Sequence, residues 1–340
     1  MPDDSSAITI TIDRLDRQVL HALRCAPRAP FRRIAEVLGS SEQTVARRYR
    51  KLHEAGVVRI FALPAPAAPG LDWLARIGVK PGAGARLADA IAKRPDVSWV
   101  GITAGGAEVV CITRPSTPAQ RDALLLERLP RTTYVTSLAS HAILHSFARE
   151  DVEEWSGFGD PLPPAQQEAL VADRSNPPAE PEGDARIEPG DAAMLEILRL
   201  DGRAGYADLA AATGWTAARA ARRLEALLAS GAVYLDVDLA LGLLGFHAEA
   251  NLWMTVAPAD LDAVGRRVAR LEQTAYAAAL SGPANLFAAV VCRDTTDLYD
   301  YLSREIGAIG AVRSAELSPV LRRVKQGSTI VQGVRLPRPA

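Results

Sequence analysis

A basic segment close to the start of the chain carries the side chains best suited to contact a charged partner. Its candidate residues are Ser41, Gln43, Thr44, Arg47, Arg48, Arg50 and Lys51. Glutamine and arginine can form paired hydrogen bonds with the edges of bases, whereas lysine and outlying arginines more often hold phosphates. Residues 15–60 contain ten Arg and Lys against four acids, a net charge of +6. This local excess suits a surface that contacts nucleic-acid phosphates.

The residues around this segment predict three short helices that would position it. Leucine and valine recur at helical spacing over 15–23, and two prolines end this first helix by residue 30. A second helix over 31–38 precedes Gly39, where a positive φ costs little, and Ser40 or Ser41 can cap a third helix over 42–54. Residues 57–63 are typical of a strand. These are the parts of a helix-turn-helix whose third helix enters the major groove of DNA.

The same unit occurs a second time in the chain. Residues 16–58 align without a gap on 191–233 at a constant offset of 175, and 14 of the 43 positions are identical. Because the matches fall at helix-core, turn and cap positions, an ancient duplication explains them better than shared composition does. The second copy balances five Arg against five acids, and its third helix offers Arg219, Arg222 and Arg223 among alanines. We therefore expect the first copy to dominate DNA binding.

Several roles stay open for the arginines of these third helices. Arg48 and Arg223 occupy the same position of the repeat, four residues before an inward leucine, so each could brace its own fold instead of touching DNA. In the second copy, Arg219 and Arg222 are the candidate contacts. Phosphate anchoring, a purely structural role and specific recognition all remain possible there.

Each helix-turn-helix is followed by a second repeated block. Residues 71–147 and 246–326 both show the order strand, helix, strand, strand, helix, strand, the βαββαβ pattern of a ferredoxin-like unit. Residues 148–189 hold eleven acids against three arginines and many prolines, so they are predicted to be an extended linker. The sequence thus predicts an α+β fold. It comprises a tail at 1–12, helix-turn-helix domains at 13–63 and 190–238, the two ferredoxin-like domains, and a tail at 327–340.

The chain resembles the Lrp/AsnC, or feast/famine, transcriptional regulators in a duplicated form. The resemblance is carried by LDRQVLHAL and IAEVLGSSEQTVARRYRKLHEAGVV in the first half, and by LSGPANLFAAVVCRDTTDLYDYL and IGAVRSAELSPVLRRVK in the second. It spans nearly everything except the tail and the linker. It implies a winged-type helix-turn-helix joined by a strand to an α/β domain that senses an effector and assembles, with the sheets of two such domains packed face to face.

The resemblance also implies where an effector such as an amino acid would bind, at a glycine turn between the second and third strands of each ferredoxin-like unit. The matching positions are Thr103, Gly105 and Glu108 in the first half, and Ser281, Gly282 and Asn285 in the second. The family usually has an acid three residues after the glycine, which Glu108 keeps and Asn285 does not. For both turns, an ordinary hairpin with a glycine turn is the alternative.

Two other functions stand beside regulation. The sirohaem decarboxylases resemble this architecture and carry haem-handling histidines near the second strand, but the matching stretches VSWVGITAGG and TAYAAALSGP contain no histidine. The chain could also be an assembly module whose second half has lost DNA binding. His141 and His145 would share a strand face without a third ligand nearby, which disfavours a metal site.

Composition indicates the broad class of the protein. With 340 residues, 48% of them hydrophobic and 23% charged, and a formal net charge of -1, the chain suits a soluble protein of several domains. It shows no signal peptide or membrane span, and its three cysteines are widely separated, so we expect a cytoplasmic location. We expect no cofactor and no catalytic residue. The expected partners are double-stranded DNA, a small-molecule effector and further copies of the chain in a homo-oligomer.

Overall fold

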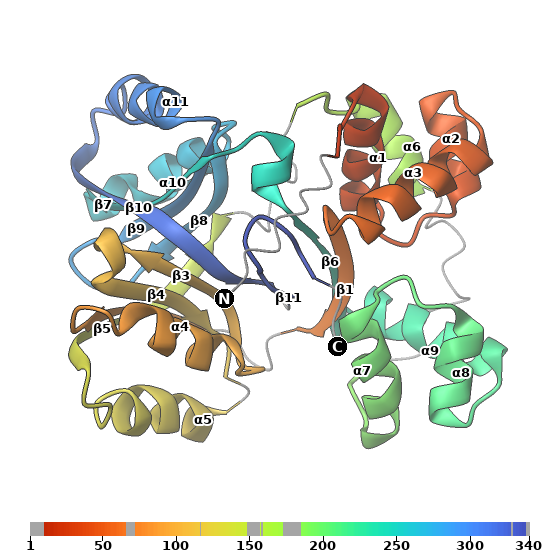
Figure 1. Ribbon diagram of the computed structural model, residues 1–340, viewed down its shortest axis with the longest axis horizontal. Helices are drawn as coiled ribbons and strands as arrows, with labels where there is room; N and C mark the ends of the chain where they lie inside the picture. Colours follow the sequence, from red (N-terminus) through yellow and green to blue (C-terminus); the bar gives the residue numbers. More distant parts are fainter. Residues whose placement is uncertain are drawn as a thin grey trace, which may run out of the picture. The chain divides into compact units, whose positions relative to one another are not determined.

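The computed structural model describes residues 10–65, 72–115, 117–147, 157, 159–172, 185–327 and 329–337. The chain forms two compact units. The first joins residues up to 63 with 158–245 and the end of the chain from 333, and the second joins 64–157 with 246–332. Each unit therefore combines equivalent segments of the two repeats. The first unit is mainly helical, and the second contains strands and helices (Figure 1).

Three helices form the first helix-turn-helix: α1 (Arg14–Cys25), α2 (Phe31–Leu38) and α3 (Glu42–Glu54). A capping box starts α1, since the Asp13 carboxylate accepts from the Asp16 amide and the Asp16 carboxylate accepts from the Asp13 amide. Gly39 ends α2 with φ at 62°, a left-handed conformation that glycine adopts cheaply. The apolar faces meet in a core whose fully buried members include Val19, Leu20, Leu23, Ile34, Val45 and Leu52.

The second helix-turn-helix repeats this layout. It consists of η4 (Pro189–Asp191), α7 (Ala192–Leu200), α8 (Tyr206–Thr213) and α9 (Ala217–Ala229). Gly214 has φ at 70° at the repeat position of Gly39, and Thr216 caps α9 as Ser41 caps α3. Strands β1 (Val58–Pro64) and β6 (Val233–Leu239), which follow the two helix triplets, pair in a two-stranded sheet that joins the domains.

Two arginines at equivalent repeat positions also join the helix-turn-helix domains. The Arg28 guanidinium donates to two carbonyls in the turn before α8, those of Gly202 (2.6 Å) and Ala204 (3.0 Å). Arg203 makes the equivalent two bonds to the turn before α2, at 2.6 and 3.0 Å. We call this reciprocal pair the arginine clasp. A contact made identically in both directions is the mark of a two-fold relationship.

The structure corrects part of the predicted linker. Within 148–189, helix α6 (Pro164–Ala172) packs against α1 and α2. Leu162 and Leu170 are only 2% and 1% exposed, and the Leu162 amide donates to Nδ1 of His21 at 2.7 Å. Burial of two leucines stabilises this segment by several kcal/mol at about 25 cal/mol per Å², which outweighs the disordering composition around it. The predicted linker residues 148–156 and 173–184 lie outside the described residues, as does most of the first tail.

The second unit contains two βαββαβ units. The first comprises β2 (Trp73–Val79), α4 (Gly84–Ala92), β3 (Val97–Thr103), η1 (Ala104–Gly106), β4 (Glu108–Thr113), α5 (Pro118–Asp122), η2 (Ala123–Arg128) and β5 (Val135–Ser146). The second comprises β7 (Ala248–Val256), η6 (Pro258–Asp260), α10 (Leu261–Ala269), β8 (Thr274–Leu280), β9 (Leu286–Cys292), α11 (Thr295–Asp300), η7 (Tyr301–Ile306) and β10 (Val312–Gln326). Short segments η5 (Leu241–Leu244), in the first unit, and β11 (Thr329–Ile330), in the second, complete the order. The α+β fold with paired helix-turn-helix and ferredoxin-like domains is therefore confirmed.

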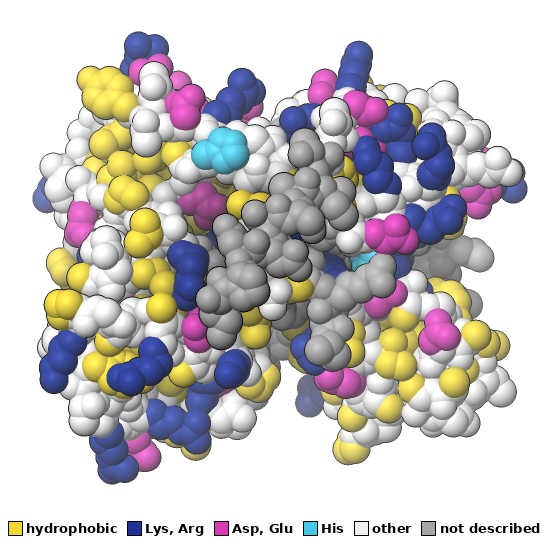
Figure 2. Space-filling model, in the orientation of Figure 1, with side chains coloured by type: hydrophobic (Ala, Val, Ile, Leu, Met, Phe, Trp, Pro, Cys, Tyr) yellow, Lys and Arg dark blue, Asp and Glu magenta, His cyan; other side chains and the backbone are white. Residues whose placement is uncertain are grey.

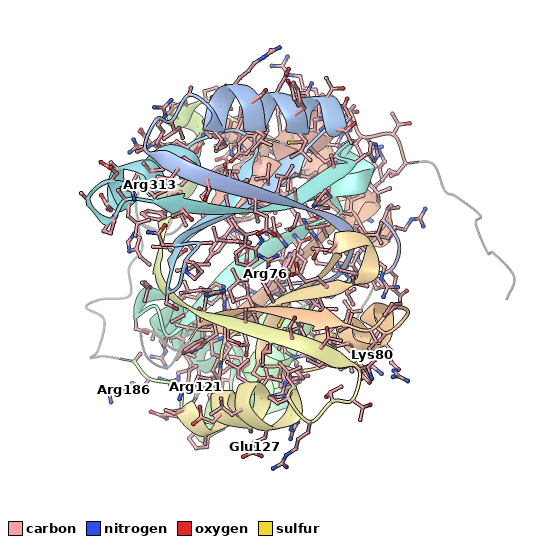
Figure 3. All side chains as sticks on the ribbon, turned by 90° about the vertical axis from the view of Figure 1, so that its left-hand side faces the viewer. Arg76, Lys80, Arg121, Glu127, Arg186 and Arg313 are labelled. Atoms are coloured by element: carbon pink, nitrogen blue, oxygen red, sulfur yellow. The ribbon has the colours of Figure 1, made fainter. Side chains whose placement is uncertain are left out.

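The two ferredoxin-like sheets are joined edge to edge. Strand β5 of the first pairs with β8 of the second, and β10 of the second pairs with β3 of the first. Because β10 also pairs with β7, eight strands close on themselves. Helices of the two halves lie on opposite outer sides, with the strands between them (Figure 3). The core between the sheets comprises Leu74, Val110, Ile112, Ile143, Trp253, Ala278, Leu280 and Phe287.

Membrane-spanning helices and metal-binding clusters are absent from the described ranges. None of their helices is long and apolar enough to cross a membrane. In the same ranges, no three His, Cys, Asp or Glu side chains are grouped to hold a metal ion. Cys111 and Cys292 are fully buried free thiols, and burial raises the pKa of each to about 12.

Candidate nucleic-acid interface and effector pocket

The outward face of α3 presents the side chains best placed to meet DNA. Gln43, Arg47 and Arg50 are all exposed. Arg50 donates only to the Ala46 carbonyl of its own helix, at 3.4 Å. Gln43 and Arg47 have no hydrogen-bonding or ionic partner within the part of the chain that the structure describes. Their donors are therefore free to bond with base edges or phosphates.

Ser41 and Thr44 have a local role at the start of α3. The Ser41 hydroxyl accepts from the Thr44 amide at 3.2 Å, and the two hydroxyl oxygens lie 2.8 Å apart. This bond satisfies one of the amides left over at the helix N-terminus. The positive end of the helix dipole lies here, so the same residues are well placed against a backbone phosphate.

Arg48 and Lys51 are held by the first helix and do not project freely. The Arg48 guanidinium lies 2.6 Å from Asp13 and 2.9 Å from Asp16, and the Lys51 ammonium lies 3.1 Å from Asp16. The Asp16 side chain is fully buried. Hydrogen bonds to Asp16 and Asp13 raise the pKa of Arg48 above its usual range. Both cations compensate a buried carboxylate, so they brace α3 against α1.

The equivalent brace occurs in the second helix-turn-helix. Arg223 donates to both carboxylate oxygens of Asp191, at 2.8 and 2.7 Å, and Asp191 is 1% exposed. Arg219 lies over the Trp215 ring, 4.5 Å from its centroid. Arg222 is exposed, as Arg47 is. Arg222 is thus an outward cation of α9 with no ionic partner among the described residues, and Arg223 has the bracing role that the sequence left open.

The two third helices differ at four of the candidate contact positions. Where the first has glutamine, threonine, arginine and lysine, the second has Ala218, Arg219, Glu225 and Ala226 at the same repeat positions. Lys and Arg side chains gather over the first helix-turn-helix at upper right, whereas apolar and uncharged surface prevails over the second at lower right (Figure 2). Only the first face combines several hydrogen-bonding side chains with positive charge.

The first predicted effector turn places its acid inside the fold. The Glu108 carboxylate accepts from Thr103 Oγ1 at 2.8 Å and from Arg76 at 3.0 Å. Arg76 also forms two bonds with Glu316, at 2.7 and 3.1 Å, and lies 4.6 Å from the Trp253 ring centroid. Figure 3 shows Arg76 between the two sheets. Bonds to Glu316, with those to Glu108, raise the pKa of Arg76. Glu108 is thus paired with Arg76 rather than turned toward a ligand.

A cavity of about 650 Å³ lies on the other side of this turn. Gly105 and Gly106 line it, together with Gly84 and Ala85 at the start of α4 and Arg322 from β10. Thr103 and Glu108 do not line it. No side chain caps the N-terminus of α4. Of the three predicted residues in this half, only Gly105 therefore borders an open volume.

The second predicted effector turn is filled by its own bonds. The Asn285 side chain accepts from the Val256 amide and donates to the Val256 carbonyl, both at 2.9 Å. The Ser281 hydroxyl accepts from the Ala142 amide at 2.8 Å, and the Ser281 carbonyl lies 2.7 Å from Nδ1 of His141. A Cβ at Gly282 would lie 2.6 Å from the same His141 ring. These contacts make the second turn a structural joint between the two halves.

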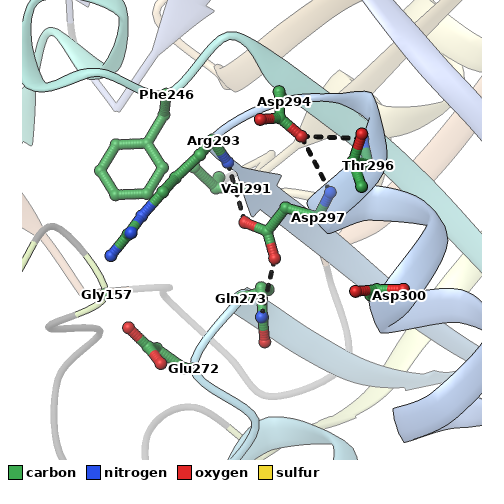
Figure 4. A pocket seen from close by; sticks show the side chains of 10 residues that line it. All are labelled: Gly157, Phe246, Glu272, Gln273, Val291, Arg293, Asp294, Thr296, Asp297 and Asp300. Atoms are coloured by element: carbon green, nitrogen blue, oxygen red, sulfur yellow. Dashed lines mark hydrogen bonds between the residues drawn. The ribbon is translucent and has the colours of Figure 1, made fainter.

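Another cavity, of about 440 Å³, lies beside α11 (Figure 4). Its acidic side chains are Glu272, Asp294, Asp297 and Asp300. Asp294 caps α11 through the amides of Thr296 and Asp297, at 2.8 and 2.9 Å. Asp297 accepts from the Gln273 side chain at 3.2 Å and the Arg293 amide at 3.0 Å. Two of the four carboxylates thus have structural roles.

The sequence did not single out Arg76 or the arginine clasp of Arg28 and Arg203. Arg76 is a charged residue on a strand whose neighbours are apolar, and that break in the pattern was a signal of a buried ion pair. Arg28 and Arg203 are among the identical positions of the two repeats, but their carbonyl partners lie across the pair of domains. Backbone acceptors leave no trace in a sequence.

Comparison with protein-family models matches the AsnC-type helix-turn-helix domain at residues 12–53 and again at 190–228. The Lrp/AsnC ligand binding domain matches residues 249–330. The HTH-type transcriptional regulator FL11 of Pyrococcus horikoshii is 36% identical over 104 residues, which cover 30% of this chain and 69% of that protein. The protein of the same name from Pyrococcus abyssi is 32% identical over 119 residues, or 34% and 79% of the two chains.

Among solved structures, the siroheme decarboxylase NirDL is similar to this chain with a TM-score of 0.58 and 15% sequence identity. The similarity covers 93% of each chain. At this identity the likeness establishes a shared fold and nothing about activity.

Proposed function

The chain belongs to the Lrp/AsnC family, and we propose that it is a DNA-binding transcriptional regulator whose first helix-turn-helix reads the DNA sequence. The observation that carries the proposal is the exposed face of α3, where Gln43, Arg47 and Arg50 project outward. Glutamine suits adenine and arginine suits guanine in the major groove. The bracing of Arg48 and Lys51 on Asp16 supports this role, because it fixes the helix that carries the reading side chains.

The second helix-turn-helix has a lesser role in this proposal. Its third helix offers Arg222 as a free outward cation, while Ala218 and Glu225 replace reading side chains. An arginine that lacks the glutamine and second arginine found beside Arg47 is better suited to hold a phosphate than to read a sequence. The second domain would therefore add affinity with little sequence preference.

The effector in this proposal is a small carboxylate-bearing metabolite, such as an amino acid, in the cavity beside Gly105. Gly84 and Ala85 at the uncapped N-terminus of α4 line the cavity, and backbone amides at a helix N-terminus favour an anionic group. Arg322 lines the same cavity, with its guanidinium paired with Asp89 at 3.1 Å. Because Asn285 and His141 fill the second turn, one cavity per chain is proposed.

An enzymatic role lacks a supporting observation of its own. The stretches that match the histidine run of the sirohaem decarboxylases form β3 with η1, and β8 with the turn after it, and they contain no histidine. The likeness to NirDL supports the architecture. We propose a regulator without catalytic activity.

DNA binding is tested by fluorescence anisotropy with labelled duplexes whose sequences are taken from the DNA that flanks the chain's own gene. Arg47→Ala should lower affinity for the preferred duplex about 10-fold or more, since a bidentate base contact contributes about 1–3 kcal/mol of discrimination. Arg222→Ala is the matched control, with the expected effect of a single phosphate contact. Equal affinity of the wild type for all duplexes, unchanged in Arg47→Ala, would refute sequence-specific regulation.

Effector binding is tested by calorimetry with a panel of amino acids and related carboxylates. Ala85→Phe should fill the cavity and abolish the heat of binding without unfolding the domain, because residue 85 is exposed on a helix. Ala90→Phe, on the same helix but away from the cavity lining, is the control and should bind normally. Binding that survives Ala85→Phe would place the effector elsewhere.

A further inference from the structure

The arrangement of the two helix-turn-helix domains carries an inference about the DNA site, which rests on the proposed function. A DNA-binding dimer presents two recognition helices related by a two-fold axis. In this chain, Arg28 contacts the carbonyls of Gly202 and Ala204, and Arg203 contacts those of Pro27 and Ala29. The two sets match at an offset of 175. One chain therefore has the symmetry that ordinarily requires two.

Further contacts hold the two domains at a fixed separation. The Gly202 amide donates to the Ile60 carbonyl at 2.7 Å, and the Ala240 amide donates to the Val57 carbonyl at 2.8 Å. A Cβ at Gly202 would lie 2.8 Å from the Phe61 amide nitrogen, so the second domain sits directly on β1. Together with the β1–β6 pairing, these bonds leave the pair of domains little freedom to change their spacing.

One member of the clasp, Arg203, is partly buried. Burial, and in smaller part the charge of Arg28, lower the pKa of Arg203. Both guanidinium groups end on backbone carbonyls, and Arg203 also lies 4.4 Å from the Phe31 ring centroid. A partly buried arginine of this kind would lose more hydrogen-bond energy on separation than an exposed ion pair would, because water would have to replace its carbonyl acceptors. The geometry thus favours one rigid arrangement.

The symmetry of the backbone is not matched by the outward side chains. On α3, Gln43, Arg47 and Arg50 face outward, whereas α9 presents Arg219, which lies over the Trp215 ring, together with Arg222 and Glu225 beside alanines. In helix-turn-helix dimers, two recognition helices contact two segments of major groove about one helical turn apart, and we expect the same of α3 and α9. Only one of these contacts has the side chains to discriminate between bases.

We infer that a single chain binds an asymmetric, two-part DNA site. The segment under α3 is read by sequence, and the adjoining segment under α9 is held through its backbone with no base preference. The site consequently has a direction. Its second part is defined by the presence of duplex and not by its sequence.

The test uses the full chain and a duplex selected from a random library. Each base pair is then substituted in turn, and the duplex is separately shortened from either end. Substitutions in one contiguous segment should weaken binding about 5- to 100-fold each. Substitutions in the neighbouring segment of about 10 base pairs should change affinity less than about twofold, whereas removal of that segment should weaken binding several-fold. Mass photometry should find one chain per duplex.

Protein variants assign the two segments without relying on disruption of the fold. Arg47→Ala should flatten the substitution profile of the first segment. In Arg222→Ala, shortening the duplex should lower affinity much less than it does in the wild type. The profile of base substitutions should stay the same as in the wild type. Both residues are exposed, so neither substitution removes a side chain from the core.

The outcomes separate this inference from the proposed function. A selected site with two inverted copies of one sequence, bound by two chains, would overturn the asymmetric site while leaving a sequence-specific regulator. Equal sensitivity to base substitution in both segments would overturn it as well. Failure of the selection to enrich any sequence would instead refute the regulator, and with it this inference.

Discussion

Arg203 lies over the ring of Tyr49, a residue of the opposite recognition helix, with its guanidinium carbon 5.5 Å from the ring centroid. Tyr49 packs on Phe31 and His53, and burial raises its pKa to about 12. The guanidinium carbon of Arg28, the reciprocal residue, lies 5.2 Å from the Tyr206 ring centroid. The repeat position equivalent to Tyr49 is occupied by Leu224, which has no aromatic ring. The arginine clasp therefore includes a contact with an aromatic residue of α3, Tyr49, and has no equivalent aromatic contact with α9.

This asymmetry predicts different effects of removing the two clasp arginines. Arg203→Met should lower the free energy of unfolding by about 2–3 kcal/mol, since it removes two hydrogen bonds from a charged donor and its contacts with Phe31 and Tyr49. Arg28→Met should cost less, about 1–2 kcal/mol. Urea unfolding of both variants measures this order. A larger loss in Arg28→Met would contradict the role of the aromatic contacts.

The arginines that brace the third helices, Arg48 and Arg223, should also contribute differently to stability. Here the larger loss is expected in the second helix-turn-helix. Arg223→Ala leaves the buried Asp191 without a cation and should destabilise the second helix-turn-helix by about 3 kcal/mol. Arg48→Ala should cost only about 1 kcal/mol, because Lys51 still pairs with Asp16. Hydrogen-exchange protection of α9 and α3 reports the two losses separately. Asp191→Asn should recover part of the Arg223→Ala loss, and equal losses in the two single variants would contradict the argument.

Glu108 is expected to matter for stability and not for the effector. Glu108→Gln removes one of the two carboxylates that flank Arg76, so it should lower stability by about 1–2 kcal/mol. Its affinity for the effector should stay within about twofold of the wild type, since Glu108 does not line the cavity. Calorimetry and urea unfolding of this one variant give both quantities. Loss of binding with normal stability would restore Glu108 as a ligand contact.

The contact between His21 and the α6 segment predicts acid sensitivity. Burial, with the nearby charge of Arg24, lowers the pKa of His21 from 6.5 to about 4. Between these values the unfolded chain binds a proton that the folded chain excludes, so stability falls as the pH drops from about 6.5 to 4 and is fully present above 6.5. The loss is of the order of 3 kcal/mol at 1.36 kcal/mol per pKa unit. Urea unfolding measured as a function of pH should show this slope.

His21→Asn provides the matched control for this pH dependence. Asparagine can keep an acceptor for the Leu162 amide but does not titrate in this range. Its unfolding free energy should lose the slope between pH 6.5 and 4, and the Leu162 amide should remain protected from exchange at pH 5. A slope that persists in His21→Asn would assign the titration to another group.

Much of the local structure could be predicted from the residues alone. Gly39 and Gly214 mark turns that need a positive φ, and Ser41 and Thr216 mark helix starts, because caps and glycine conformations depend on a few neighbouring residues. Alternation and helical spacing likewise predicted the order of elements in both ferredoxin-like units. The helix at 164–172 was missed, because its composition is that of a linker and its stability comes from leucines buried against α1 and α2.

Which candidate side chains are available to a ligand was decided only by the tertiary structure. Arg47 and Arg48 are neighbours of the same type, yet Arg48 is bound by Asp16 from another helix while Arg47 faces outward. Glu108 and Asn285 both find partners inside the fold, in Arg76 and in the Val256 backbone. Short-range patterns determine helices and strands. The partner of a long polar side chain depends on which distant groups the fold brings within about 3 Å, and no local pattern contains that information.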